Sequence, residues 1–397
     1  MTLSVLHVST YATNGGAARA ASALNLAMLN EGIDSRILTA HGTKFRIASE
    51  LDRRLWKLQR TETKTWRSPA FFKSLNARIL NESSADVINL HWVTDGFLSI
   101  EEIGKITKPV VWSMYDMWPF CGTEHYGVNT PDARWRTGYT TSNRPSAEAG
   151  LDIDRWTWER KLKNWNSMHM VPASSWMLTS LKSSKLMNNW SSTRIPHVID
   201  CELFRPMGQD EARDNLNLPK NVPLIVFLAS AGVTDSRKGF DLLAQALPKV
   251  QENFPSVEVA IAGPASTVYT LPGAIPVHWV GQLNSNEQLR SFYCSATVVA
   301  TPSREDNMPL TAMEAQSCGR PVVAFDIGGL PDIVVSGETG YLARELNVKD
   351  LASGLINTLT DAMAENSMGI AARKHALQTW SQSVVVKKYL DLYATIS

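Results

Sequence analysis

Two carboxylates that bracket the predicted start of a helix are the residues best placed for chemistry in this sequence. Asp306 lies in a loop after a predicted strand, 297–300, and Glu314 lies on the second turn of a helix predicted to begin near Pro309. N–H groups at a helix start attract an anion such as a diphosphate, and carboxylates accept hydrogen bonds from sugar hydroxyls. The spacing therefore allows one acid to bind the ribose of a nucleotide while the other binds a sugar. The adjacent Glu305 is an alternative to Asp306 in this role.

Two other loops that follow predicted strands carry residues suited to phosphate groups. Arg237 and Lys238 stand side by side before a predicted helix, and an arginine fork with a lysine point charge can hold two phosphates. Gly15 and Gly16 separate the first strand from an alanine-rich helix, where glycine lets the backbone approach a ligand closely. Taken alone, the basic loop is explained just as simply as a solvated turn, and the glycine loop as a plain tight turn between strand and helix. The glycine loop also lacks the spacing of the dinucleotide fingerprint.

Composition limits the classes of protein to which the chain can belong. Its 397 residues predict two domains, and 44% hydrophobic with 19% charged residues are typical of globular proteins. The net charge of +1 gives no basic surface for duplex nucleic acid. Four cysteines, far apart and without a CxxC pair, predict neither a disulfide framework nor a zinc site. The first residues indicate a buried strand rather than a signal peptide, so we expect a cytoplasmic protein.

Short apolar runs alternate with amphipathic stretches along the chain, which predicts strand–helix–strand units in parallel sheets. Strands are expected near 5–9, 36–39, 87–91, 110–114, 168–171, 224–229, 257–262, 277–280, 297–300 and 322–325, and helices near 17–31, 51–73 and 175–183, with a helical tail from about 348. The pattern restarts after 194–206, where two prolines restrict the backbone. It predicts two doubly wound domains with the working site in a cleft between them, beyond the carboxyl ends of the strands.

The segment 302–340 resembles the donor-binding signature of the GT-B, family 4 retaining glycosyltransferases. Asp306 and Glu314 match the two acids of an acid-x7-acid element. The segments Cys318–Val323 and Gly328–Asp332 match the strand and the glycine-rich turn that follow this element in the family.

The resemblance covers nearly the whole chain. Gly15-Gly16 is similar to the first acceptor-side loop of the family, and Lys238-Gly239 to its diphosphate-binding lysine. The segment 112–118, WSMYDMW, is similar to the Trp-Thr-Leu-His-Asp-Met-Trp segment of a subgroup associated with bacterial exopolysaccharide and colanic-acid-type assembly. The family implies the α/β GT-B fold, in which two Rossmann-like domains face a central cleft. The acceptor-side domain would cover 1–200, with the C-terminal helix 380–397 packed on it, and the donor-binding domain 201–379.

The activity that the resemblance implies is that of a retaining, metal-independent glycosyltransferase of the hexosyl type. It would move a sugar from a nucleotide-diphosphate sugar to a hydroxyl of a glycan or lipid-linked acceptor in bacterial surface polysaccharide synthesis. No cofactor and no nucleic-acid partner are expected, and peripheral contact with the inner membrane is a further expectation. The residues implied in catalysis are Asp116, Tyr115, Lys238, Arg237 and Asp306. Those implied in donor binding are Gly15, Gly16, Lys238, Arg237, Asp306, Asn307, Met308, Pro309, Leu310 and Glu314.

The sequence departs from the family pattern at several positions. Tyr115 stands where the family has a histidine before Asp116, and His125 is a candidate to replace it, although a lone histidine is more often simply packed. The arginine expected just after strand 224–229 is missing, and Arg237 is its candidate substitute. These departures leave open two alternatives, a catalytically silent scaffold that binds a sugar nucleotide and a GT-B epimerase.

Overall fold

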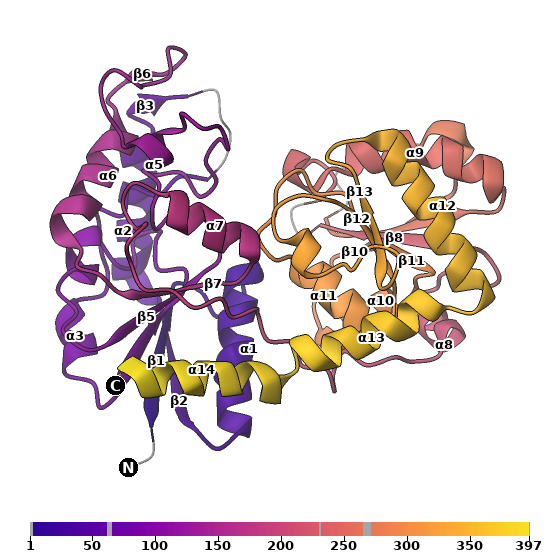
Figure 1. The fold of residues 1–397 in the computed structure, drawn as a ribbon, viewed down its shortest axis with the longest axis horizontal. Coiled ribbons are helices and arrows are strands. Elements are labelled where there is room, and N and C mark those ends of the chain that lie inside the picture. The colour runs from indigo at the N-terminus through magenta and orange to yellow at the C-terminus, as the bar shows by residue number, and fades with distance from the viewer. Residues whose placement is uncertain (1–2, 62–65, 230–231, 265–270, 397) are drawn as a thin grey trace. The chain divides into compact units, whose positions relative to one another are not determined.

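The computed structural model describes residues 3–61, 66–229, 232–264 and 271–396, which form two compact units. Unit 1 runs to Pro196 and takes in the chain again from Val386 onward, and unit 2 comprises His197–Val385. Each unit has a parallel β-sheet flanked by helices, so the chain has the predicted α/β class (Figure 1). The division falls a few residues from the predicted boundaries at 200 and 379.

The main sheet of unit 1 has the strand order β2-β1-β4-β5-β7, and every neighbouring pair is parallel. Its strands are β1 (Ser4–Ser9), β2 (Asp34–Thr39), β4 (Val87–Leu90), β5 (Val110–Met114) and β7 (His169–Pro172). They confirm the five strands predicted in the first half of the chain. The chain order reverses between β1 and β4, and in such sheets ligands bind beyond the carboxyl ends of the strands at that point.

The helices of unit 1 follow and flank these strands (Figure 1). They are α1 (Gly16–Asn30), α2 (Gly42–Trp56), α3 (Ala77–Asn81), α4 (Ile100–Ile103), α5 (Arg134–Thr137), α6 (Ile153–Asn164) and α7 (Ser175–Ser183). A short antiparallel pair, β3 (Gln59–Arg60) with β6 (Ala149–Gly150), lies outside the main sheet.

The predicted helix 51–73 is wrong. The helix in this region is α2, which begins nine residues earlier than predicted at Gly42 and ends at Trp56. Residues 70–72, which follow this helix, are held in a loop by Asp52 on α2. The buried carboxylate of Asp52 accepts hydrogen bonds of 2.9–3.2 Å from their backbone N–H groups. Pro69 also disfavours helix at the residue before it. Residues 62–65 of the predicted helix lie outside the described residues.

The sheet of unit 2 has the strand order β10-β9-β8-β11-β12-β13 and is parallel throughout. Its strands are β8 (Leu224–Leu228), β9 (Glu258–Ala262), β10 (Val277–Gly281), β11 (Val298–Thr301), β12 (Val322–Phe325) and β13 (Gly340–Ala343). Five of these were predicted. The edge strand β13 was missed because it opens with a glycine, which weakens the strand pattern. The chain order reverses between β8 and β11.

Unit 2 contains six α-helices within its described residues. They are α8 (Gln209–Asp214), α9 (Phe240–Asn253), α10 (Asn286–Ser295), α11 (Leu310–Ser317), α12 (Val348–Ala364) and α13 (Ser367–Thr379), with the 3₁₀ turns η1 (Ser236–Lys238), η2 (Pro272–Ala274) and η3 (Leu330–Asp332). In Figure 1, α9 lies beside α12, and α11 lies beside α13. In the part of the chain that is described, no helix combines the length and the apolar character needed to cross a bilayer.

The last helix, α14 (Gln382–Ile396), is anchored to the sheet of unit 1 by two buried tyrosines. Asn89 Nδ2 on β4 donates to the Tyr393 hydroxyl at 2.9 Å. The Tyr389 hydroxyl lies 2.9 Å from Ser113 Oγ on β5. These contacts join residues about three hundred positions apart in the sequence, and they fix the end of the chain on the first sheet.

Replacing Tyr393 by phenylalanine is expected to loosen this tail. The change leaves the buried Asn89 amide without its acceptor, which costs about 1–3 kcal/mol. Hydrogen exchange of the tail amides should become at least fivefold faster in Tyr393→Phe, whereas Tyr341→Phe, whose hydroxyl bonds Asp350 in unit 2, should leave it unchanged. Equal exchange in both variants would contradict the anchoring role.

Candidate functional site

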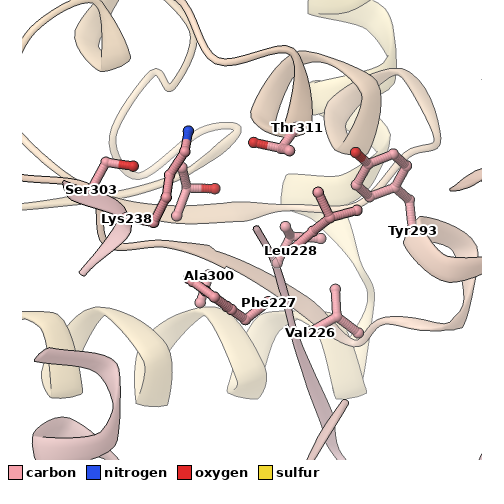
Figure 2. Close-up of a pocket in the computed structure, with 10 residues that line it drawn as sticks. Val226, Phe227, Leu228, Lys238, Tyr293, Ala300, Ser303 and Thr311 are labelled. Atoms are coloured by element: carbon pink, nitrogen blue, oxygen red, sulfur yellow. The ribbon is translucent and has the colours of Figure 1, made fainter. Parts of the chain in front are cut away.

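A pocket in unit 2 lies at the carboxyl ends of β8 and β11, where the strand order of the sheet reverses. The two strands supply its apolar floor. Figure 2 shows four polar side chains above that floor, Lys238, Ser303, Thr311 and Tyr293. A cation and three hydroxyls above an apolar floor suit a ligand that combines charged groups with an organic ring.

The loop that carries Lys238 is fixed by backbone contact with the loop after β11. Gly239 has a φ of +71°, and a Cβ atom there would lie 1.9 Å from the carbonyl oxygen of Pro302, so this position requires glycine. Arg304 ties the two loops together, because its guanidinium donates to both carboxylate oxygens of Asp241 at 2.7 and 2.6 Å. The lysine is therefore held against the loop that bears the predicted acids.

Both predicted cations converge on the predicted loop acid. Lys238 Nζ lies 2.7 Å from Asp306 Oδ2, and Arg237 Nη1 lies 3.8 Å from the same oxygen. Asp306 is 7% exposed, so the pair with Lys238 is poorly screened by solvent. The structure thus brings two adjacent cations to an acid that follows them by 68–69 positions in the sequence.

A glycine-rich turn holds Asp306 from the other side. Gly328 has a φ of +53°, and a Cβ atom at this position would lie 2.0 Å from the carbonyl oxygen of Asp306. The backbone N–H of Gly329 donates to that same carbonyl at 3.0 Å. The turn after β12 therefore has to be glycine for the acid-bearing loop to keep its position.

The first backbone N–H groups of α11 are hydrogen-bond donors at the end of the loop that carries Asp306. Pro309 occupies the N-cap position, one residue before the helix begins at Leu310, and its side chain makes no capping bond. The first N–H groups of a helix lack intrahelical partners and attract anions. Ser303 Oγ is 1% exposed and has no hydrogen-bond partner among the described residues, which is costly unless a ligand or water supplies one. Asn307 and Met308, also predicted to bind the donor, are buried in the loop before this helix.

The helix acid Glu314 is buried on α11 and is positioned by a tyrosine that the sequence did not reveal. Glu314 is 2% exposed, and its Oε2 accepts a hydrogen bond of 2.7 Å from the hydroxyl of Tyr293 on α10. Neither Asp306 nor Glu314 therefore extends into bulk solvent. No spacing rule links residue 293 to residue 314, so this contact could not be predicted from the sequence.

Two titratable groups beside Asp306 have shifted pKa values. Burial raises the pKa of Glu305 to about 7, with a smaller opposing effect of Arg237. Burial lowers the pKa of His197 to about 4, although the negative charge of Asp306 opposes this shift. At neutral pH His197 is therefore uncharged, and Glu305 is the group near the pocket that changes its charge.

Tyr115, Asp116 and His125 of unit 1 line a second pocket, beyond the ends of β4 and β5. The Tyr115 hydroxyl lies 2.9 Å from His91 Nδ1, whereas Asp116 Oδ2 lies 2.6 Å from His125 Nδ1. His125 therefore contacts the predicted acid directly, as expected for a candidate to replace the missing histidine. His91 in turn bonds His7, whose pKa is lowered to about 3 by complete burial, so that ring is neutral.

The glycine loop of unit 1 lies at the carboxyl end of β1. Gly15 is the N-cap of α1 with a φ of +90°, and beyond the adjoining backbone a Cβ atom at Gly15 or Gly16 would have no described heavy atom within 4 Å. The loop is therefore open at the start of a fifteen-residue helix. Gly15, Gly16, Tyr115 and Asp116 belong to unit 1, and the other predicted site residues to unit 2. Residues 230–231, where the family's arginine was expected, lie outside the described residues.

Solved structures with the same fold were found across the whole chain. A sucrose-phosphate synthase from Thermosynechococcus elongatus is 17% identical and aligns over 99% of this chain and 98% of its own, with a TM-score of 0.68. HepE from Anabaena, in complex with UDP and glucose, is 14% identical and aligns over 99% and 100%, with a TM-score of 0.66. These likenesses establish the predicted GT-B fold.

Curated relatives match a smaller part of the chain. The D-inositol 3-phosphate glycosyltransferase of Corynebacterium aurimucosum is 34% identical over 211 residues, which is 49% of this chain and 49% of the relative. The enzyme of the same name from Mycolicibacterium smegmatis is 32% identical over 50% of this chain and 47% of its own. The chain thus spans about half the length of the curated relatives it matches.

A family model locates the matching domain. Residues 222–361 match the model described as glycosyl transferases group 1. This range contains β8 to β13, both loops that meet at Asp306, and the helix that carries Glu314. Residues 222–361 of unit 2 therefore resemble the group 1 glycosyl transferases, in a chain that has the GT-B fold.

Proposed function

We propose that this protein is a retaining, metal-independent glycosyltransferase that takes a hexose from a nucleotide-diphosphate sugar. The observation that carries the proposal is the convergence of Lys238, Asp306 and the start of α11 at the carboxyl ends of β8 and β11. An ammonium group and helix N–H groups suit a diphosphate, and two buried carboxylates suit the hydroxyls of ribose and sugar. The family match of residues 222–361 and the UDP complex of the Anabaena neighbour support a donor of this class.

Transfer of the sugar requires the protein to stabilise negative charge on the leaving diphosphate, which these residues can do. The bond between the anomeric carbon and the diphosphate oxygen breaks, and a bond from the acceptor oxygen forms on the same face of the sugar. The acceptor proton passes to the leaving phosphate, so no protein base is needed. Negative charge grows on the diphosphate, and Lys238, Arg237 and the N–H groups of α11 would stabilise it there.

Two classes of acceptor have support. The similarity of segment 112–118 to an exopolysaccharide subgroup favours a glycan or lipid-linked hydroxyl, in a cytoplasmic protein that contacts the inner membrane. The curated relatives, named as D-inositol 3-phosphate glycosyltransferases, favour a small phosphorylated polyol. Parallel assays with an inositol phosphate and with membrane lipid extracts would separate the two classes.

A panel of nucleotide sugars tests the proposed activity without knowledge of the acceptor. One donor should raise the melting temperature by mass action and release its nucleoside diphosphate slowly in water. Glu314→Gln keeps the side-chain volume and should weaken that donor about tenfold, because a carboxylate–hydroxyl bond becomes a neutral one. Binding without release would indicate the silent scaffold, and inversion at a sugar carbon the epimerase. No stabilisation by any donor would contradict the proposal.

Donor affinity is expected to fall as the pH rises through 7. Below this pH Glu305, whose pKa is about 7, is neutral, and above it the carboxylate repels the diphosphate. Because the diphosphate diester keeps its charge over this range, the dissociation constant of UDP-glucose should rise about threefold between pH 6 and 8.5. Calorimetry should find that Glu305→Gln abolishes this dependence. An unchanged pH dependence in the variant would show that Glu305 does not cause it.

A further inference from the structure

A chain of three buried side chains runs behind the pocket of unit 1. Ser68 Oγ lies 2.8 Å from His125 Nε2, and His125 Nδ1 lies 2.6 Å from Asp116 Oδ2. Both ring nitrogens of His125 are therefore engaged. Asp116 and His125 line the pocket, whereas Ser68, at 2% exposure, lies behind them.

The shortest contacts favour one arrangement of protons along this chain. The carboxylate at 2.6 Å favours a proton on His125 Nδ1, so in the neutral ring Nε2 is the acceptor. The Ser68 hydroxyl then donates to Nε2 at 2.8 Å in preference to Thr94 Oγ1, which lies 3.1 Å away. Trp92 Nε1 lies 3.1 Å from the same oxygen of Asp116 and 3.3 Å from His125 Nδ1, so with Nδ1 protonated it donates to the carboxylate. The backbone N–H of Trp118 donates to Oδ1 at 3.0 Å. Three donors thus hold the carboxylate in one orientation.

A chain of serine, histidine and aspartate is also the arrangement of a hydrolytic triad. The surroundings of Ser68, however, do not suit a nucleophile. The backbone of Ser68 is fully engaged, since its N–H donates to the carbonyl of Thr123 and its carbonyl accepts from Trp118 Nε1. Ser68 is also 2% exposed and does not line the pocket, so its hydroxyl is not presented to a substrate. The geometry therefore favours a supporting role for Ser68.

We propose that Ser68 and His125 are positioning residues that hold the Asp116 carboxylate in place for the acceptor hydroxyl. Ser68 selects the Nδ1–H tautomer of His125, and this tautomer donates to Asp116. A carboxylate fixed in this way orients the attacking hydroxyl, and rotation of the imidazole would release it. This role in turnover rests on the proposed glycosyl transfer, whereas the tautomer of His125 does not.

Nitrogen-15 NMR of the imidazoles tests the tautomer directly. The spectrum of the full chain should show His125 with a protonated Nδ1 and an unprotonated Nε2, assigned by the loss of its signals in His125→Gln. Ser68→Ala should produce a mixture of tautomers. Ser184→Ala removes an equally buried hydroxyl elsewhere in unit 1, which bonds the Leu181 carbonyl, and should leave the His125 signals unchanged. A wild-type ring protonated on Nε2, or an unaltered ring in Ser68→Ala, would overturn the proposal whether or not the protein transfers sugar.

Kinetics then tests what the tautomer does in turnover. With the donor found by the nucleotide-sugar panel and its acceptor, Ser68→Ala should lower kcat about tenfold at unchanged donor KM, and Ser68→Thr, which keeps the hydroxyl, should restore it. A loss in KM alone would overturn the positioning role. Treatment with diisopropyl fluorophosphate should leave Ser68 unmodified, and its phosphorylation would overturn the proposal in favour of a nucleophile.

Discussion

Replacing Lys238 by alanine is expected to lower the turnover of the donor sugar by about 10²–10³-fold, the range seen when one preorganised charge-stabilising group is lost. Lys238 is the cation nearest Asp306, at 2.7 Å, and its amino group lies above the floor of the pocket (Figure 2). Its removal leaves the buried carboxylate with Arg237 at 3.8 Å. The site then repels a diphosphate that it would otherwise attract.

The measurement is the rate of nucleoside diphosphate release by Lys238→Ala at saturating donor. Lys249→Ala is the matched control, because Lys249 is an exposed lysine on α9 that pairs only with Glu252 among the described residues. The control should keep wild-type turnover and a melting temperature within about 2 °C of wild type without donor. Lys238→Ala should still unfold cooperatively, at a temperature a few degrees lower, because the buried Asp306 loses its nearest partner. Turnover within threefold of wild type in Lys238→Ala would remove this residue from the site.

The second large effect is expected from Gly328→Ala. A Cβ atom there would lie 2.0 Å from the carbonyl oxygen of Asp306, and the φ of +53° is strained for any residue with a side chain. The acid-bearing loop has to move, so donor binding should be lost in addition to a loss of stability of about 1–3 kcal/mol.

Gly337→Ala separates the effect of lower stability from the effect of a displaced Asp306 loop. Gly337 also has a positive φ, of +82°, but beyond its chain neighbours its added Cβ would meet no described heavy atom within 4 Å. This variant should lose stability by about 1 kcal/mol and keep its affinity for the donor. Thermal unfolding with and without donor distinguishes the variants. Equal donor affinity in both would show that the turn does not position Asp306.

Local patterns were sufficient to predict most strands and the loops of the site. The central strands of both sheets, such as β4, β8, β11 and β12, are short runs that are buried on both faces, and such runs are recognisable without a partner. The segment around Asp306 was recognisable because its proline, glycines and acids lie within about forty positions. These signals lie along the chain, so the fold and the donor-side residues could be predicted together.

The contacts that complete the sites could not be predicted in this way. Tyr293 meets Glu314, and Ser68 meets His125, only because the fold brings separate helices and loops together. A serine in a loop or a tyrosine on an amphipathic helix has no local pattern that distinguishes it from its neighbours. The helix predicted over 51–73 failed for the same reason, since Asp52 binds the backbone of residues 70–72 through a long-range contact.

The most direct test of the account is a crystal structure of the protein with its preferred nucleotide sugar. We expect the diphosphate to lie between Lys238 Nζ and the first N–H groups of α11, with a hydroxyl of the ligand on Glu314. A nucleotide sugar bound elsewhere, with the Lys238–Asp306 pair and the pocket between β8 and β11 unoccupied, would contradict it.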